Sequence, residues 1–204
     1  MGQEIRCGAL IGGKTEQGRL LLESDALLFR SPNVRLNIPF GEITEVSSRG
    51  ESLVVGTGPK SHEFDVGSAA ERWVRRITNP KTLLEKLGVK SEEGVVYIGS
   101  VDSGLLTELK AAKVRVAKEL RGDDLDCILI GVESPTDLGQ IKGLNSRIKP
   151  NGKIWVIFPK GRADLKDVNV IAAGKSAGLV DNKIARVSER LTAMKLVIPV
   201  KRRK

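Results

Sequence analysis

A glycine turn in the second half of the chain is the stretch best suited to hold a ligand. The β-branched run 95–98 ends at Gly99, a polar turn follows at 100–103, and a helix is expected from Gly104. A strand, a glycine turn and a helix in this order form the first βα unit of a doubly wound sheet, where ligands usually bind. The pattern therefore predicts a binding site beside Gly99, which the rest of the second half supports.

Two cations follow another apolar run. Lys160 and Arg162 come directly after 153–158, at the expected carboxyl edge of the sheet. Side chains of this kind bind phosphates or carboxylates through charge-assisted hydrogen bonds. They are also common as ordinary loop charges, and the sequence leaves both alternatives open.

Few other residues suit catalysis or metal binding. The chain has one histidine, His62, and two cysteines, Cys7 and Cys127, in different halves. Zinc sites are built from cysteine, histidine and carboxylate ligands, so no metal site is expected. A histidine-based triad is not expected either, and no catalytic residue is assigned. The cysteines lie in apolar runs and are predicted to be small buried side chains in a reducing cytosol rather than a disulfide.

The charge is unevenly distributed. Residues 1–80 carry ten basic and ten acidic side chains, so the net charge of +9 belongs to residues 81–204, which end in a basic tail at 201–204. The basic tail can contact nucleic acid or an acidic partner, and a solvated terminus that aids solubility is the favoured alternative. With 3% aromatic residues, however, a base-stacking surface is not expected. No apolar run approaches the about 20 residues of a membrane span, and no secretion signal is visible, so a cytoplasmic protein is expected.

The first half reads as an all-β domain. Seven short strands are predicted, with a glycine-rich loop at 12–18, and their ranges are 5–11, 19–23, 26–30, 35–40, 43–47, 52–57 and 62–66. The period then changes: Ser68 and Glu71 form a predicted capping box, and Trp73 lies on the apolar stripe of a closing helix. Residues 19–78 resemble pleckstrin-homology (PH) and GRAM domains. The resemblance lies in the paired strands 20–30, the segment 36–43 and the helix with Trp73. The resemblance implies a barrel closed by a C-terminal helix. Because this half has no net charge, a protein contact is favoured over inositol-phosphate binding.

The second half reads as an α/β domain. Asn79 and Pro80 mark the boundary and are expected to start a helix that ends at Gly88. This divides the chain into domains 1–79 and 80–204. Strands at 95–98, 114–117, 127–132 and 153–158 then alternate with helices at 104–112, 134–148 and 164–178, the last capped by Asp164 and with Val168 on its buried stripe. Runs 183–188 and 194–200 are predicted to form an antiparallel hairpin.

Parallel α/β units that end in such a hairpin are typical of class I S-adenosylmethionine-dependent methyltransferases. Residues 80–200 resemble an uncharacterised bacterial family of shortened domains of this Rossmann-like class. The stretches that carry the resemblance are 81–88, 153–160, and 178–184 with 194–197. The resemblance implies a possible S-adenosylmethionine site. Gly99 would be the first of three motif glycines, whose other positions hold Val101 and Ser103, and Gly104 follows one position late.

The resemblance also assigns two carboxylates. Asp102 would accept from the cofactor ammonium, and Glu119, about 20 residues after Gly99, would hold the ribose hydroxyls. A solvated strand end without a ligand is the alternative for Glu119. The segment 131–135 lacks the amide and the aromatic residue of the amino-methylating motif, and the third βα unit is missing.

Three hypotheses follow from these features. The first is a two-domain protein that binds a protein partner or a small ligand without catalysis, built from a PH-like module and a degenerate methyltransferase-like domain. The second is an active S-adenosylmethionine-dependent methyltransferase of unknown substrate. The third is a nucleic-acid-associated protein that uses the basic second half. Binding at low salt separates the third from the others, since phosphate contacts are strongest there.

Overall fold

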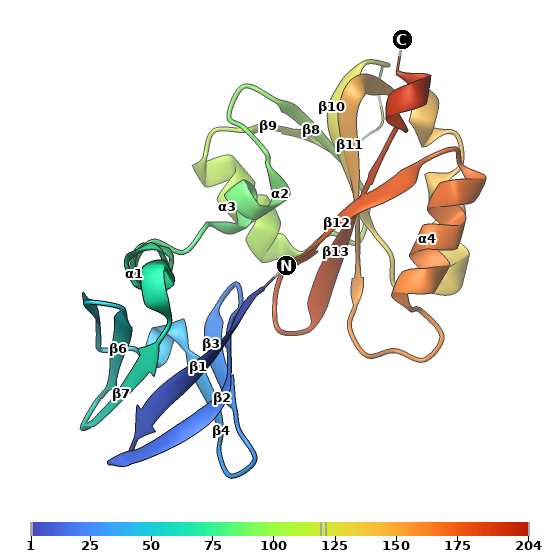
Figure 1. The fold of residues 1–204 in the computed structure, drawn as a ribbon. Helices are drawn as coiled ribbons and strands as arrows, with labels where there is room; N and C mark the ends of the chain where they lie inside the picture. Colours follow the sequence, from blue (N-terminus) through green and yellow to red (C-terminus); the bar gives the residue numbers. More distant parts are fainter. Residues whose placement is uncertain (1, 119, 121, 204) are drawn as a thin grey trace. The chain divides into compact units, whose positions relative to one another are not determined.

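A computed structural model describes residues 2–118, 120 and 122–203 (Figure 1). The chain divides into two compact units, Met1–Lys81 and Thr82–Lys204. We call them the antiparallel unit and the α/β unit and describe each by itself. The division falls two residues after the predicted boundary at 79/80.

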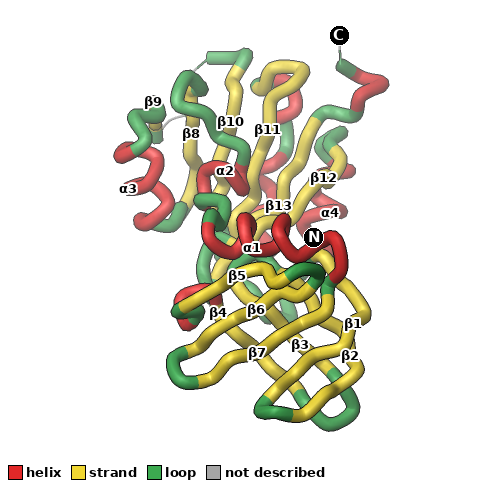
Figure 2. The backbone as a smooth tube through the Cα atoms, turned by 60° about the vertical axis from the view of Figure 1, so that its left-hand side comes forward, coloured by secondary structure: helices red, strands yellow, loops and turns green. Residues whose placement is uncertain are grey.

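The antiparallel unit contains one bent seven-stranded sheet (Figure 2). Its strands are β1 (Gln3–Ile11), β2 (Lys14–Leu22), β3 (Ala26–Arg30), β4 (Arg35–Pro39), β5 (Glu45–Arg49), β6 (Ser52–Thr57) and β7 (Lys60–Asp65). The order is β4-β3-β2-β1-β7-β6-β5, and every pairing is antiparallel. The predicted succession of short strands is therefore present as one large antiparallel sheet.

The prediction of a loop over residues 12–18 is wrong. Strand β2 begins at Lys14, and only Gly12 and Gly13 turn the chain, with φ of 56° and 79°. Two consecutive residues with positive φ make the hairpin turn whose twist matches that of the flanking strands. The polar residues that follow belong to a strand, because β2 pairs with β1 along its full length.

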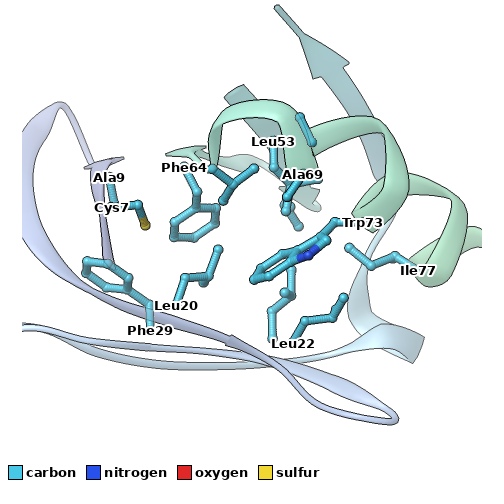
Figure 3. Packing of buried hydrophobic residues seen from close by; sticks show 14 of the residues in the cluster. Cys7, Ala9, Leu20, Leu22, Phe29, Leu53, Phe64, Ala69, Trp73 and Ile77 are labelled. Carbon is cyan, nitrogen blue, oxygen red and sulfur yellow. The ribbon is translucent and has the colours of Figure 1, made fainter. Parts of the chain in front are cut away.

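Helix α1 (Ala70–Thr78) contributes Trp73 to the core of the antiparallel unit. Figure 3 shows this indole beside Ile77 of the same helix and Leu22 of the sheet. The predicted capping box is not formed. Ser68 lies inside a 3₁₀ turn, Gly67–Ala69, and Ala69 occupies the N-cap position. Ala69 itself has helical φ and ψ of −80° and −15°, so α1 continues directly from the 3₁₀ turn and no side chain caps it.

The α/β unit contains a six-stranded mixed sheet with helices on both faces (Figure 1). Its strands are β8 (Gly94–Gly99), β9 (Arg115–Ala117), β10 (Leu125–Gly131), β11 (Ile148–Pro159), β12 (Val180–Arg186) and β13 (Leu191–Val197), in the order β12-β13-β11-β10-β8-β9. The first four are parallel, whereas β13 is antiparallel to both β11 and β12. The sheet confirms an α/β, Rossmann-like part that ends in an antiparallel hairpin.

Three α-helices cover this sheet. Helices α2 (Leu83–Leu87) and α3 (Ser103–Ala111) lie on one face, and α4 (Asp167–Ser176) lies on the other. Buried apolar side chains fill both spaces, around Trp155 and Leu129 on the first face and around Ile128 and Val156 on the second. Strands β10 and β11 are therefore covered on both sides, as their uninterrupted apolar runs predict.

Several predicted helix ends in this unit are wrong. Helix α2 starts at Thr82, not Asn79: the Thr82 side chain accepts from Glu85 N at 3.2 Å, and the Glu85 carboxylate accepts from Thr82 N at 2.8 Å. Both sites satisfied the local pattern for a cap, but only Thr82 has the acidic residue three positions later that completes a capping box.

The segment 134–148 does not form one α-helix. It forms two 3₁₀ helices, Pro135–Ile141 and Leu144–Ser146, separated at Gly143, which has a φ of 81°. A glycine in the left-handed region ends a helical run.

The predicted start of the next helix is also wrong. Helix α4 begins after Lys166, not after Asp164, and Val168 is 64% exposed while Val170 and Gly174 face the sheet. Leu165 is buried but precedes the helix, so Val170 and Gly174, one turn apart, define the face of α4 that packs on the sheet.

Candidate functional site

The switch point of the α/β sheet lies between β8 and β10. The chain passes from β8 through α3 to β9 on one side, and then returns to β10 on the other side of β8. Ligands of open α/β sheets bind outside the carboxyl ends of the strands at such a point. Here these ends are Gly99 and Gly131, which are direct neighbours in the register of the two strands.

Both glycines are required by close backbone contact. Gly99 has a φ of 72°, and a Cβ atom there would lie 2.5 Å from the Gly131 carbonyl oxygen. A Cβ atom on Gly131 would lie 2.0 Å from the Ser100 oxygen. The turn therefore packs against the end of β10, and the Ser100 backbone fills the space between the two strands. Gly99 and Ser100 keep an exposed outer side, which is where a ligand at this turn would lie.

The two other predicted residues of this turn belong to the start of α3. Asp102 is its N-cap, and its carboxylate accepts from Leu105 N at 2.9 Å. Gly104 is exposed in the first helical turn, where a Cβ atom would lie 3.0 Å from Asp102 Oδ1. Asp102 thus has a structural role in the cap, and binding of a cofactor ammonium stays a prediction. Glu119, the predicted ribose ligand, lies outside the described residues.

The structure directs Lys160 and Arg162 to different loops. Lys160 Nζ donates to the Ser188 carbonyl at 2.8 Å, in the turn between β12 and β13. Arg162 makes a two-pronged contact with Asp164, at 2.9 and 2.5 Å, and donates to the Glu133 carbonyl at 2.7 Å. The hydrogen bond from Arg162 lowers the pKa of Asp164. Anion binding by these two residues stays a prediction, but a bound anion would have to share Arg162 with a carboxylate.

Asp137 holds the loop after β10. Its carboxylate accepts from Glu133 N at 2.9 Å and from Ser134 N at 2.8 Å, and these bonds lower the pKa of Asp137. Sequence reasoning placed Ser134, Pro135 and Asp137 at the start of a helix but did not identify Gly131. The sequence signal that could have identified Gly131 was its position at the end of an uninterrupted apolar strand.

Sequence reasoning also missed a cavity in the antiparallel unit. Its volume is about 540 Å³. Its lining comes from the ends of β1 and β7, the β6–β7 turn, β4 and the segment after β4, and consists of Ile11, Gly12, Leu36, Asn37, Ile38, Glu42, Thr57, Pro59, Lys60, Ser61 and His62. His62 is 6% exposed, and its Nδ1 has no hydrogen-bond partner among the described residues. Burial, and then the charge of Lys60, lower the pKa of His62. The sequence signal for the burial of His62 was its position two residues before Phe64 on one strand, which puts both side chains on the same face.

The two cysteines match their prediction. Cys7 and Cys127 are both free and buried. Burial raises the pKa of Cys7 to about 11 and that of Cys127 to about 12, so neither presents a thiolate at neutral pH. Within residues 2–118, 120 and 122–203, no cluster of three or more metal-binding side chains is present. In the same part of the chain, no helix is long and apolar enough to cross a membrane.

Comparison with known proteins gives structural likeness only. No protein-family model matches the sequence, and no curated protein matches it. Similar solved structures include SAM-dependent methyltransferases. One is an O-methyltransferase from Thermotoga maritima, with 10% identity and a TM-score of 0.42, covering 89% of this chain and 95% of that one. Another, from Aquifex aeolicus, has 13% identity and a TM-score of 0.41 and covers 61% and 93%.

A TehB-like methyltransferase from Corynebacterium glutamicum has 11% identity and a TM-score of 0.38 and covers 64% and 96%. Likeness at this level carries no argument about activity. The assignment of an α/β, Rossmann-like part therefore rests on the strand order and strand directions of the sheet itself.

Proposed function

We propose that this chain is a non-catalytic binding protein, built from a methyltransferase-like α/β unit and a PH-like antiparallel unit. The observation that supports the absence of catalysis is the state of the charged groups at the carboxyl edge of the sheet. Asp102 caps α3, Arg162 pairs with Asp164, and Asp137 holds two backbone N–H groups. A general acid or base must exchange a proton with its substrate, and groups that already hold a helix end, a loop or an ion partner are less suited to that task.

The PH-like assignment rests on the order of elements. Seven antiparallel strands are followed by one helix whose tryptophan enters the core, which is the plan of that class. Residues 1–80 of the unit have no net charge, and its cavity carries Glu42 as well as Lys60. An inositol phosphate needs a surplus of cations, so contact with a protein or with a small neutral ligand fits this unit better.

Calorimetric titration with S-adenosylmethionine and S-adenosylhomocysteine tests the proposal. We expect no saturable heat for either compound up to about 1 mM, a concentration that corresponds to a binding free energy of about −4 kcal/mol. Incubation with methyl-labelled cofactor and cell extract is expected to transfer no label. Saturable binding together with transferred label would contradict the proposal.

A methyltransferase is the second candidate, and one observation favours it. Gly99 ends a central strand at the switch point, has positive φ and keeps an exposed backbone. The variant Asp102→Asn gives a matched test, because asparagine caps helices as well as aspartate but carries no charge. If the cofactor binds and its ammonium contacts Asp102, this variant weakens binding while the thermal stability stays unchanged. Binding that Asp102→Asn leaves unaltered would remove Asp102 from the site.

A further inference from the structure

Three lysines lie side by side on one face of the α/β sheet. Lys183 on β12 is directly opposite Lys195 on β13, and Lys195 is directly opposite Trp155 on β11. Lys153 precedes Trp155 by two positions on the same strand, so its side chain leaves the sheet on the same face. Like charges directly opposite each other on antiparallel strands destabilise a sheet unless something neutralises them.

Neutralisation by the chain itself is incomplete. Lys153 Nζ contacts both Glu93 oxygens, at 2.8 and 2.6 Å, and donates to the Gly88 carbonyl at 2.7 Å. Lys183 Nζ donates to the Lys86 carbonyl at 2.6 Å. Within residues 2–118, 120 and 122–203, no carboxylate forms an ion pair with Lys183 or Lys195. In the described part of the chain, Glu93 is thus the carboxylate that contacts this lysine group, since Asp126, which also interacts with Lys153, pairs with Lys149.

The C-terminal segment adds a fourth cation. Arg203 donates from Nε to the Ile198 carbonyl at 2.9 Å, which ties the chain back just after β13. Burial first, and then Lys153, Lys183 and Arg203, lower the pKa of Lys195. The ammonium of Lys195 is thus in an unfavourable position that a bound anion would relieve.

This cluster lies at the opposite edge of the sheet from the glycine turn. Lys153 pairs with Cys127, which in turn pairs with Val95 near the start of β8, and Lys195 is near the end of the antiparallel β13. Both positions belong to the edge at which the parallel strands begin. The cluster is therefore separate from the carboxyl edge, where Gly99 and Gly131 lie.

We propose that Lys183, Lys195 and Arg203 bind a phosphate-bearing anion at the amino edge of the six-stranded sheet. Exposed lysines and arginines bind phosphate oxygens by charge-assisted hydrogen bonds, and three cations within one cluster suit a group that carries more than one negative charge. The phosphate can belong to a small molecule or to a nucleic-acid backbone. The proposal goes beyond the proposed function and does not depend on it.

The test compares Lys195→Met with Lys175→Met in the full chain. The Lys195 side chain caps no helix and donates no hydrogen bond in the structure described. Its replacement therefore removes a cation without breaking a hydrogen bond. Lys175 lies on α4, on the other face of the sheet, and its replacement removes the same charge elsewhere. Far-UV circular dichroism checks that both variants fold.

Pyrophosphate is titrated by calorimetry, and a labelled single-stranded oligonucleotide is titrated by fluorescence anisotropy, both at about 20 mM salt, where phosphate binding is strongest. We expect Lys195→Met to weaken binding about tenfold and to lower the salt slope by about 1, while Lys175→Met binds like the wild type. Binding of pyrophosphate alone assigns a small ligand, and tight binding of the oligonucleotide assigns a nucleic-acid backbone. If neither probe binds, or if both variants bind like each other, the proposal is wrong.

Discussion

The two units bury their sheets in different ways. On β6 and β7 of the antiparallel unit, buried and exposed positions alternate, so Leu53, Val55 and Phe64 face one core. On β10 from Cys127 to Gly131 and on β11 from Gly152 to Phe158, every residue is buried, because helices cover both faces. A sheet with one buried face leaves its other face to polar residues, whereas a sheet covered on both sides confines them to the strand ends. The difference explains why the candidate sites of the α/β unit all lie at the two edges of its sheet.

The largest effect is expected from a methyl group at the switch point. Gly131→Ala would place Cβ 2.0 Å from the Ser100 oxygen and 2.3 Å from the Ser100 carbonyl carbon, and neither backbone atom can move without breaking the turn. We expect the α/β unit to lose more than about 3 kcal/mol of unfolding free energy, as in severe overpacking. The indole N–H resonances of Trp73 and Trp155, one in each unit, report urea unfolding of the two units separately.

Gly139→Ala is the matched control for this change. No atom lies within 4 Å of its Cβ position, so its effect should stay within about 0.5 kcal/mol. A stable Gly131→Ala protein would show that the turn and β10 are not locked together.

The next largest difference between the two units is expected from their ion pairs, one of which is buried and the other exposed. The Lys153 side chain is 10% exposed and that of Glu93 is 18%, so Lys153→Met leaves a carboxylate with little solvent around it. We expect a loss of about 3 kcal/mol in the α/β unit, measured by urea unfolding. The double variant Lys153→Met with Glu93→Gln should recover part of that loss.

The antiparallel unit supplies the comparison. Arg19 and Glu4 form an ion pair at 3.4 Å, and both side chains are about half exposed. Arg19→Met should change stability by less than about 1 kcal/mol. Equal losses in the two units would contradict the assignment of Lys153 as a buried paired charge.

A smaller difference in stability is expected when the tryptophan of each unit is replaced. Trp155 Nε1 donates to the Leu87 carbonyl at 2.9 Å, whereas Trp73 Nε1 is buried with no partner among the described residues. Replacement by phenylalanine removes similar volume at both positions, but only Trp155→Phe leaves an acceptor unpaired. We expect Trp155→Phe to be more destabilising than Trp73→Phe by about 1 kcal/mol, measured by denaturant unfolding. A larger loss for Trp73→Phe would mean that packing volume outweighs the hydrogen bond.

The smallest effect is expected from pH and should be confined to the antiparallel unit. The pKa of His62 is lower in the folded protein than in the unfolded chain. Between these two values the unfolded state binds more protons, so stability is fully present above the ordinary pKa of about 6.5 and falls as the pH is lowered below it. Urea unfolding of wild type and His62→Gln between about pH 7.5 and 5.5 tests this expectation. The wild type should lose stability over this range and the variant should lose less; parallel curves would exclude His62 as the cause.

Much of the secondary structure followed from sequence, because local rules suffice for it. The change from alternating to continuous apolar runs separated the two kinds of sheet, and the run around Cys127 marked a central strand. Helix ends were less predictable where two local patterns competed. Asn79 with Pro80, and Asp164, resembled caps, but Thr82 and Lys166 begin the helices. In both helices the observed start is the residue whose partner three positions later, Glu85 or Asn169, accepts a hydrogen bond from its backbone N–H.

The candidate site was predicted in position but not in contacts. Gly99 was found because a glycine turn after a strand is a local signal, and the structure places it at the switch point. Gly131 was missed, because its need for a glycine comes from Ser100, a residue far away in the sequence. The pairing of Arg162 with Asp164 is short in sequence, but its third contact, with Glu133, requires the loops after β10 and β11 to be adjacent.

The sequence by itself determined the division into two kinds of sheet, the positions of most strands, and that all the net positive charge lies after residue 80. Only the tertiary structure decided the order of the strands. It inserted β13 between β11 and β12, and so set Lys195 opposite Lys183 and next to the strand of Lys153. The physical reason is that periodicity reports how each segment meets solvent and core, whereas the pairing of distant strands depends on contacts that no local pattern contains.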